Sequence, residues 1–195
     1  MRVIAGALRG RRLKVPSGLE VRPTSDRVRE ALFDLLGDRI AGAMFLDAYA
    51  GSGAVGIEAL SRGASGAVLV ESHREALEAI EENLAIDPLL ETGARVIASD
   101  IASALNRLFR EKTLFDIVFM DPPYGPELER GLRLVSRAGL LASGGIVIAE
   151  HETRNIPRPT AGLVARMSRS YGRAALTIYD PSGDTLPVAG YSGPR

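Results

Sequence analysis

The sequence predicts an α/β fold of the doubly wound type, built on a parallel sheet. Short apolar runs typical of buried strands alternate with segments whose apolar residues recur at helical spacing. A glycine-rich turn joins the first strand to the first helix of the series, and several apolar runs end in a carboxylate. In such sheets, ligands bind outside the carboxyl ends of the strands. We expect one domain over residues 21–182, a basic extension over residues 1–20 and a loosely ordered tail over residues 183–195.

The N-terminal residues predict a basic hairpin. Residues 2–6 and 11–15 have the composition of short strands, and residues 7–10 between them form a turn that ends in glycine. Residues 1–29 carry a net charge of +6, and the rest of the chain carries −6. This asymmetry favours a surface that binds a polyanion, since Arg matches phosphate oxygens, although a solvated basic edge strand is the simpler interpretation. The candidate RNA-binding residues are Arg9, Arg11, Arg12, Lys14 and Arg27.

A helix is expected to follow the proline-rich loop after the hairpin. Ser25 or Thr24 is a suitable N-cap, and apolar residues recur at helical spacing as far as about Asp38. Arg22 and Thr24 cluster with Arg27 at its start, where they would either cap and solubilise the helix or line a site.

The segment over residues 44–63 predicts a nucleotide-binding strand–turn–helix unit. Its Gly-x-Gly-x-x-Gly pattern fits a dinucleotide, another nucleoside cofactor or only a tight turn. Asp47, directly before the pattern, would repel a pyrophosphate but suits a cation such as S-adenosylmethionine; a helix-entry cap is the simpler role. The candidate cofactor-binding residues here are Asp47, Tyr49, Ala50, Gly51 and Gly53.

Two further strands end in carboxylates. A strand over residues 67–71 closes on Glu71, 20 residues after Gly51, the spacing at which an acidic residue binds ribose hydroxyls. A strand over residues 95–100 closes on Asp100, which suits either an adenine amino group or the cap of the next helix. Further cofactor-binding candidates are therefore Glu71, Asp100 and Ile101.

The second informative segment follows a buried strand over residues 117–120. Asp121, Pro122, Pro123 and Tyr124 come next, at the carboxyl end of that strand. The prolines stiffen the loop and carry no N–H, the carboxylate accepts hydrogen bonds, and the tyrosine offers a flat face for a base. These four residues are the candidate catalytic group, suited to hold a planar aromatic amine. A rigid turn with a core tyrosine is the alternative.

The C-terminal third predicts one more parallel strand and an antiparallel pair. The strand covers residues 144–150, and the pair covers residues 163–170 and 174–180. His151 is interpreted as a solvent-facing strand end rather than a site residue. The helices between the strands are expected over residues 54–62, 74–86, 101–110 and 127–137.

Composition excludes several functions. The chain has no cysteine and only two histidines, His73 and His151, so we expect no disulfide and no metal site. No apolar run approaches the roughly 20 residues of a membrane span, and the N-terminus lacks the apolar core of a signal peptide. We therefore expect a cytoplasmic protein without a membrane partner.

Together these motifs resemble the RsmD family, bacterial methyltransferases that act on a guanine N2 of 16S ribosomal RNA. The Asp-Pro-Pro-Tyr motif is shared with DNA adenine and glutamine methyltransferases, whereas the N-terminal hairpin with the Arg-Pro-Thr block at residues 22–24 is specific. The family often has an acidic residue where Ser72 or His73 stands. The matching segments are residues 2–6, 10–14, 22–33, 46–62, 116–124 and 171–172.

The resemblance implies a Rossmann-like class I methyltransferase fold: a seven-stranded, mostly parallel sheet with an antiparallel last strand, helices on both faces, and the small N-terminal hairpin. It implies S-adenosylmethionine as cofactor, bound by Asp47, Gly51 and Gly53. Glu71 would contact the ribose and Asp100 the adenine, and the Arg-Pro-Thr block would close over the methionine end. The partner would be 16S ribosomal RNA in the small subunit or an assembly intermediate, bound by a monomer.

Three other functions fit parts of the chain. A DNA adenine-N6 methyltransferase shares the amine chemistry but usually needs a target-recognition domain, for which there is little room. An NAD-dependent dehydrogenase fits the glycine pattern and Glu71 but leaves the Asp-Pro-Pro-Tyr motif unexplained. A non-catalytic RNA-binding module explains the basic hairpin but not the strand-end carboxylates.

Overall fold

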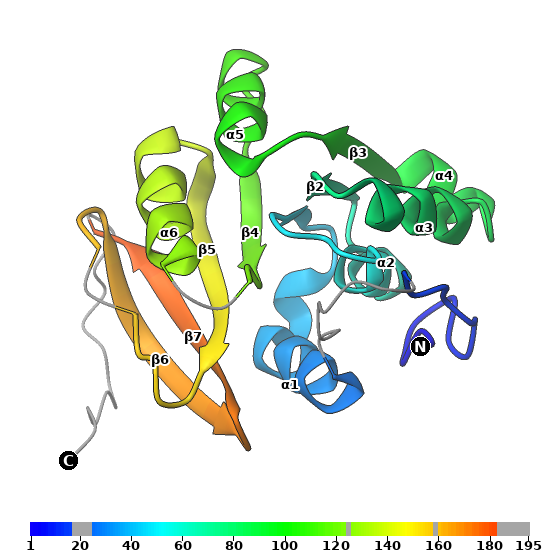
Figure 1. Ribbon diagram of the computed structural model, residues 1–195, viewed down its shortest axis with the longest axis horizontal. Coiled ribbons are helices and arrows are strands. Elements are labelled where there is room, and N and C mark those ends of the chain that lie inside the picture. The colour runs from blue at the N-terminus through cyan, green and yellow to red at the C-terminus, as the bar shows by residue number, and fades with distance from the viewer. Residues whose placement is uncertain (17–24, 124–125, 158–159, 183–195) are drawn as a thin grey trace.

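A seven-stranded sheet in the order β3-β2-β1-β4-β5-β7-β6 forms the centre of the molecule (Figure 1). The computed structural model describes residues 1–16, 25–123, 126–157 and 160–182. Strand β7 runs antiparallel to both of its neighbours, and the other paired strands are parallel. This confirms the expected mostly parallel sheet. The strands are β1 (Met44–Asp47), β2 (Gly66–Glu71), β3 (Ala94–Ala98), β4 (Phe115–Met120), β5 (Leu141–Glu152), β6 (Leu163–Tyr171) and β7 (Ala174–Pro181).

Helices cover both faces of the sheet, as the resemblance implied. Successive strand residues point to opposite faces, so Phe45 and Leu46 belong to two different apolar cores. One core lies under α1 to α4, and the other lies under α5 and α6. The helices are α1 (Asp26–Leu36), the 3-10 turn η1 (Gly37–Ile40), α2 (Ala54–Ser61), α3 (Arg74–Leu84), α4 (Pro88–Gly93), α5 (Ile101–Arg110) and α6 (Glu127–Ala138).

Helix boundaries depart from the sequence expectation at residues with capping side chains. Ser25, one of the two expected caps, accepts a hydrogen bond from the backbone N–H of Val28 and begins α1. Helix α3 ends at Leu84, two residues before the expected end. Asp87 then accepts a hydrogen bond from the Leu89 N–H and begins the short helix α4, which has proline in its first turn. The sequence did not predict this helix, since Asp-Pro is equally typical of a helix stop.

The strand order reverses direction at β1, which pairs with β2 on one side and β4 on the other. Ligands of doubly wound sheets bind in the crevice at such a switch point, outside the carboxyl ends of the strands. The glycine-rich turn after β1 and the Asp-Pro-Pro segment after β4 both begin there. Across the part of the chain that is described, no helix is long and apolar enough to cross a membrane.

The N-terminal hairpin has less regular strand structure than expected. One antiparallel bridge, between Arg2 and Arg12, replaces the two expected strands. The hairpin instead packs on the domain, since Val3, Leu8 and Leu13 are buried in the core that also contains α1 and α2. The expected end of the extension, residues 17–20, lies outside the described residues.

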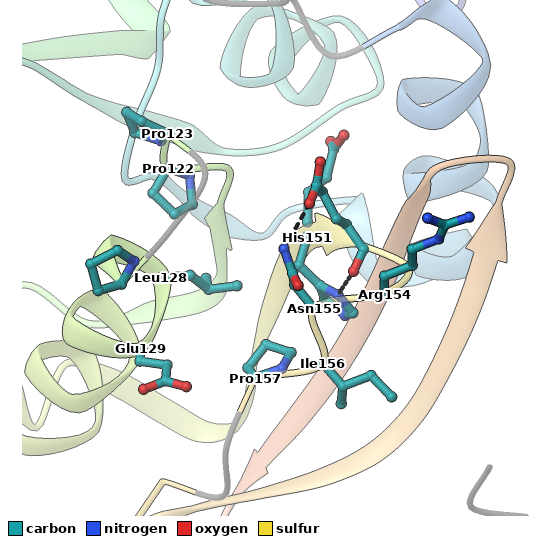
Figure 2. A pocket seen from close by; sticks show the side chains of 12 residues that line it. Pro122, Pro123, Leu128, Glu129, His151, Arg154, Asn155, Ile156 and Pro157 are labelled. Carbon is teal, nitrogen blue, oxygen red and sulfur yellow. Dashed lines mark hydrogen bonds between the residues drawn. The ribbon is translucent and has the colours of Figure 1, made fainter. Parts of the chain in front are cut away.

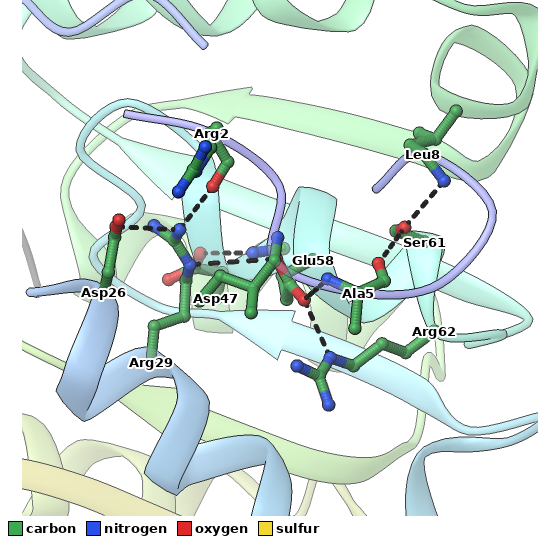
Figure 3. A network of polar contacts seen from close by, with 11 residues as sticks. Arg2, Ala5, Leu8, Asp26, Arg29, Asp47, Glu58, Ser61 and Arg62 are labelled. Atoms are coloured by element: carbon green, nitrogen blue, oxygen red, sulfur yellow. Dashed lines mark hydrogen bonds and ion pairs between the residues drawn. The ribbon is translucent and has the colours of Figure 1, made fainter. Parts of the chain in front are cut away.

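A buried carboxylate, Glu58 of α2, holds this hairpin in place (Figure 3). Its oxygens accept hydrogen bonds from the backbone N–H groups of Ile4, at 2.8 Å, and Ala5, at 2.9 Å. Arg62 donates to Glu58 at 2.8 Å, and the fully buried Arg29 of α1 lies 3.8 Å from it. Glu58 therefore joins the hairpin to both helices through one side chain.

We expect Glu58→Gln to lower the free energy of unfolding by about 3 kcal/mol, because it leaves the buried charge of Arg29 with only the exposed Asp26, 3.1 Å away, as a counter-charge. Urea denaturation followed by circular dichroism measures this loss. The matched control is Glu78→Gln, which removes an exposed ion pair with Arg74 and should cost less than about 0.5 kcal/mol. Equal, small losses in the two variants would contradict the role given to Glu58.

Candidate active site

The glycine-rich turn begins where β1 ends. The Ala50 N–H bonds to the carbonyl of Val70 at 2.9 Å, and the Gly53 N–H bonds back to Ala50 at 2.7 Å. Gly51 and Gly53 have φ angles of 55° and 77°, a region that favours glycine. A Cβ on Gly53 would lie 2.9 Å from a Leu69 methyl group, whereas one on Gly51 would meet no atom within 4 Å. Gly53 thus allows close helix–sheet packing, and the backbone at Gly51 is open to a ligand.

Asp47, the last residue of β1, is almost fully buried at 1% exposure. Its Oδ2 accepts a hydrogen bond from the backbone N–H of Gly56 at 3.0 Å, so it also serves as the helix-entry cap considered from the sequence. Its Oδ1 has no hydrogen-bond partner among the described residues. Burial, followed by the negative charges of Asp121 and Glu71, raises the pKa of Asp47 to about 7. The site therefore favours a cationic ligand.

Glu71 ends β2 and fixes the glycine turn from the side. Its Oε2 accepts the Gly51 N–H at 2.8 Å, and its Oε1 accepts the N–H groups of Ser72, at 2.7 Å, and His73, at 2.8 Å. A carboxylate has about four acceptor positions, so Oε2 can accept one more hydrogen bond, as from a hydroxyl group. His73 is the N-cap residue of α3, without a side-chain cap bond, where the family often has an acidic residue.

Asp100 caps α5, one of the two roles expected from the sequence. Its carboxylate accepts hydrogen bonds from the N–H groups of Ala102, at 3.0 Å, and Ser103, at 3.1 Å, and from the Ser103 hydroxyl at 2.7 Å. These bonds, with the Ser103 hydroxyl first, lower the pKa of Asp100. The side chain of Ile101 is buried in the core under α5.

Tyr49 joins the glycine turn to α6. Its hydroxyl donates to Glu127 Oε1 at 3.2 Å, at the first residue of that helix. A Cβ on Gly131 would lie 2.7 Å from this hydroxyl oxygen, so glycine makes room for the tyrosine. Burial and the Glu127 carboxylate raise the pKa of Tyr49. The side chain therefore positions the turn after β1 against the helix that follows the Asp-Pro-Pro segment.

A cavity of about 540 Å³ lies beside the Asp-Pro-Pro segment (Figure 2). Pro122 and Pro123 form one wall, and residues at the end of β5 face them across the opening. Tyr124 lies outside the described residues, as do Arg22 and Thr24. The remaining lining residues are Pro126, Leu128, Glu129, Glu150, His151, Glu152, Arg154, Asn155, Ile156 and Pro157.

The expectation that His151 faces solvent was wrong. Strand β5 continues to Glu152, and β7 covers this end of it, so His151 is only 4% exposed. Its ring nitrogens lie 2.8 Å from the hydroxyl oxygen of Thr177 and 2.8 Å from the carbonyl oxygen of Glu152. Burial lowers the pKa of His151, which favours the neutral ring.

The structure separates four of the five candidate RNA-binding residues into two groups. Arg11 lies 3.8 Å from Asp87, and Lys14 forms an ion pair with Glu82, so both face acidic residues of the domain. Arg9 and Arg27 instead line a second cavity, of about 430 Å³, between the hairpin and the start of α1. Arg12 is exposed. The other residues lining this cavity are Arg2, Val3, Ile4, Gly10, Asp26 and Glu30.

Among residues 1–16, 25–123, 126–157 and 160–182, no group of three or more histidine or acidic side chains is arranged to hold a metal ion. The candidate cofactor residues after β1 and β2 do meet around the glycine turn, through the bonds of Glu71 and the buried Asp47. Glu150 was not among the sequence-predicted site residues. A carboxylate at the end of a parallel strand, the same signal that identified Asp47 and Glu71, could have identified Glu150.

The sheet order, with the antiparallel β7 beside β5, defines the class I methyltransferase fold. An rRNA methyltransferase from Streptomyces viridochromogenes is similar in fold alone, with a TM-score of 0.64 over 85% of this chain and 88% of that one, at 15% identity. Two solved structures are more similar. One from Escherichia coli has a TM-score of 0.79 at 40% identity, over 93% of this chain and 97% of that one. One from Thermus thermophilus has a TM-score of 0.78 at 36% identity, over 91% of this chain and 98% of that one.

A family model described as conserved hypothetical protein 95 matches residues 1–180. Ribosomal RNA small subunit methyltransferase D of Escherichia coli is 40% identical over 181 residues, which covers 92% of this chain and 89% of that protein. The protein of the same name from Haemophilus influenzae is 35% identical over 153 residues, which covers 78% of this chain and 79% of that protein. The chain therefore belongs to the RsmD family, which confirms the resemblance found in its motifs.

Proposed function

We propose that this protein transfers a methyl group from S-adenosylmethionine to the exocyclic N2 of a guanine in 16S ribosomal RNA. The observation that carries the proposal is the meeting of strand-end carboxylates at the switch point of the sheet. Asp47 accepts the Gly56 N–H, Glu71 accepts the Gly51 N–H, and Asp121 follows β4, the strand that pairs with β1. Asp121 directly precedes Pro122, which lines a cavity of about 540 Å³, large enough for a base. The relatives named as small subunit rRNA methyltransferases support the same activity.

The residues present fit S-adenosylmethionine better than a dinucleotide. Asp47 has an acceptor atom without a partner among the described side chains, and its neighbours are acidic, so a positive charge is favoured and a pyrophosphate is not. The open backbone at Gly51 and the remaining acceptor position of Glu71 suit the nucleoside part, with Asp100 near the adenine. When bound, the cofactor would supply an electrophilic methyl group carried on a sulfonium. The amino nitrogen that gains the methyl group would lose one proton, and the Asp121 carboxylate proposed to accept that N–H would receive it.

The Asp-Pro-Pro segment would hold the target amine. An enzyme cannot reach N2 inside a helix, so the guanine must be flipped out of its stack. Asp121 and the carbonyl of Pro122 would each accept one N–H of the amino group, which makes the nitrogen pyramidal, takes its lone pair out of conjugation with the ring and directs it toward the methyl donor. The rigid prolines fix these acceptors, and most of the catalysis is positioning. We propose that Tyr124 stacks on the base.

The second cavity offers a place for the RNA backbone. Arg9 and Arg27 line it together with Arg2, while Arg11 and Lys14 are occupied by Asp87 and Glu82. We propose that Arg9 and Arg27 contact phosphates and that Arg11 and Lys14 mainly anchor the hairpin. The proposed partner is the small ribosomal subunit or an assembly intermediate, met by a monomer in the cytoplasm.

The double variant Arg9→Ala/Arg27→Ala should weaken RNA binding and flatten its salt dependence. Loss of two phosphate contacts is expected to reduce the slope of log K against log salt by about 1.5. The control, Arg11→Ala/Lys14→Ala, removes the same charge and should change the slope much less. Filter binding of 16S RNA between low and moderate salt measures the slope for each double variant. Equal slopes for the two variants would contradict the separate roles given to the two pairs of residues.

The whole proposal is tested by methyl transfer from labelled S-adenosylmethionine to small subunits purified from cells that lack this gene. After digestion to nucleosides, label in N2-methylguanosine of 16S RNA is the expected result. Label in DNA adenine, with none in RNA, would move the activity to the alternative amine substrate. If no label is transferred although the protein still binds S-adenosylmethionine, 16S ribosomal RNA is not its substrate.

A further inference from the structure

We propose that Glu150 selects guanine by accepting a hydrogen bond from N1–H while Asp121 holds N2. This inference rests on the proposed function and names the residue that sets its base specificity. Glu150 lies near the carboxyl end of β5, is 8% exposed, and lines the cavity beside Pro122 and Pro123.

Strand register places the two carboxylates next to each other. Met120, the last residue of β4, pairs with Ala149 of β5, and the same register continued by one residue brings Asp121 and Glu150 to neighbouring positions. Neighbouring strands are about 4.8 Å apart, and residues in register share a face of the sheet. Two residues earlier, Phe119 and Ile148 lie in the same core, which agrees with this shared direction.

Two other polar residues that line the cavity, Asn155 and His151, are held by hydrogen bonds. Asn155 donates to the Glu152 carboxylate at 2.7 Å, as Figure 2 shows, and the ring of His151 is bonded to Thr177. The walls formed by prolines and Ile156 are apolar. Glu150 is buried, lines this cavity and follows Ala149, the register partner of Met120.

The arrangement matches the hydrogen-bonding edge of guanine. A guanine presents N1–H and the N2 amino group as adjacent donors on its Watson–Crick edge, which two adjacent carboxylates can accept. Adenine presents a lone pair at N1, which would face the Glu150 carboxylate and repel it. A site built to bond an N–H group rejects an analogue without it by as much as roughly 10,000-fold. The pair therefore explains selectivity for guanine over adenine, including against the DNA adenine alternative.

The test uses small subunits reconstituted with 16S RNA in which 2-aminopurine riboside replaces the methylated guanosine. This base keeps the N2 amine but has an acceptor at N1. The wild-type enzyme should prefer guanosine by at least about 1,000-fold in kcat/KM. Glu150→Gln should lower methylation of guanosine about 10-fold and raise that of 2-aminopurine, because the amide can donate to N1, so the preference falls at least about 100-fold.

Glu152→Gln is the matched control, since it changes a carboxylate of the same cavity that is bonded to Asn155. It should leave the preference for guanosine unchanged. S-adenosylmethionine affinity, measured by calorimetry, should be within a few-fold of wild type in both variants, which shows that they fold.

Two results would overturn the role of Glu150. One is an equal loss on both substrates in Glu150→Gln, as expected of a structural residue. The other, which needs no variant, is similar wild-type rates on guanosine and 2-aminopurine. Failure of the proposed function is a different result, because the wild-type enzyme would then not methylate N2 of guanosine in unmodified subunits.

Discussion

Replacing Asp121 by alanine is expected to lower the rate of methyl transfer by about 1,000-fold, the upper range for loss of one polar group that stabilises a transition state. The physical reason is the target nitrogen, whose lone pair is conjugated with the purine ring and must be turned toward the methyl donor. Without the carboxylate acceptor, the amine keeps its planar geometry, and bound substrates react from a misaligned position.

Cofactor affinity should change only a few-fold in the same variant. The residues proposed to bind the cofactor are Asp47, Gly51 and Glu71. Asp47 is held by the Gly56 N–H, and Glu71 is held by the N–H groups of Gly51, Ser72 and His73, all of which remain in the variant. Single-turnover rates with saturating cofactor, together with calorimetric titration of S-adenosylmethionine, separate the two effects. Asp121→Asn, which keeps one acceptor oxygen, should lose less activity than Asp121→Ala. Loss of cofactor binding as the main defect would assign Asp121 to the wrong part of the site.

Local sequence patterns predicted the parts of the site that depend on neighbouring residues. Gly51 and Gly53 occupy a turn whose positive φ angles need glycine, and Ser25 and Asp100 cap the helices that begin beside them. Such features are set within a few residues of chain, so composition and spacing reveal them.

Features that depend on strand register or on packing between distant segments were not predictable in this way. Glu150 becomes a neighbour of Asp121 only through the pairing of β4 with β5. The two groups of basic residues separate only because Asp87 and Glu82 lie against one side of the hairpin. His151 is buried by β7, which is distant in sequence.

The apo-protein carrying Asp47→Asn should be more stable than wild type at alkaline pH. Folding raises the pKa of Asp47 from 3.8 to about 7, so the folded wild-type protein retains a proton that the unfolded chain has released between these values. The contribution of Asp47 to the free energy of unfolding of the wild-type protein therefore falls as the pH rises from about 4 through 7. This change in pKa corresponds to a difference in unfolding free energy on the order of 4 kcal/mol by pH 8, which should vanish near pH 4.

The asparagine can keep the bond to the Gly56 N–H through its own oxygen, so the charge is the principal change. Urea denaturation of both proteins at pH 4, 6 and 8 measures the difference. Asp116→Asn, at an exposed carboxylate that accepts from the Met44 N–H at 2.8 Å, is the control and should show no comparable gain with rising pH. A variant at position 47 that is less stable than wild type at pH 8 would contradict the prediction.

The same substitution should weaken cofactor binding about 100-fold at pH 8, equivalent to about 2.7 kcal/mol, because a cationic ligand loses its buried counter-charge. At pH 6 the difference should shrink, since wild-type Asp47 is then largely protonated and must release its proton when the cation binds. Calorimetry in buffers of different ionisation enthalpy would detect that release in wild type and not in the variant. Opposite effects on stability and binding would identify Asp47 as a residue whose buried charge destabilises the apo-protein and stabilises the complex. If the wild-type protein and Asp47→Asn instead bound S-adenosylmethionine with equal affinity, Asp47 would have only its helix-cap role.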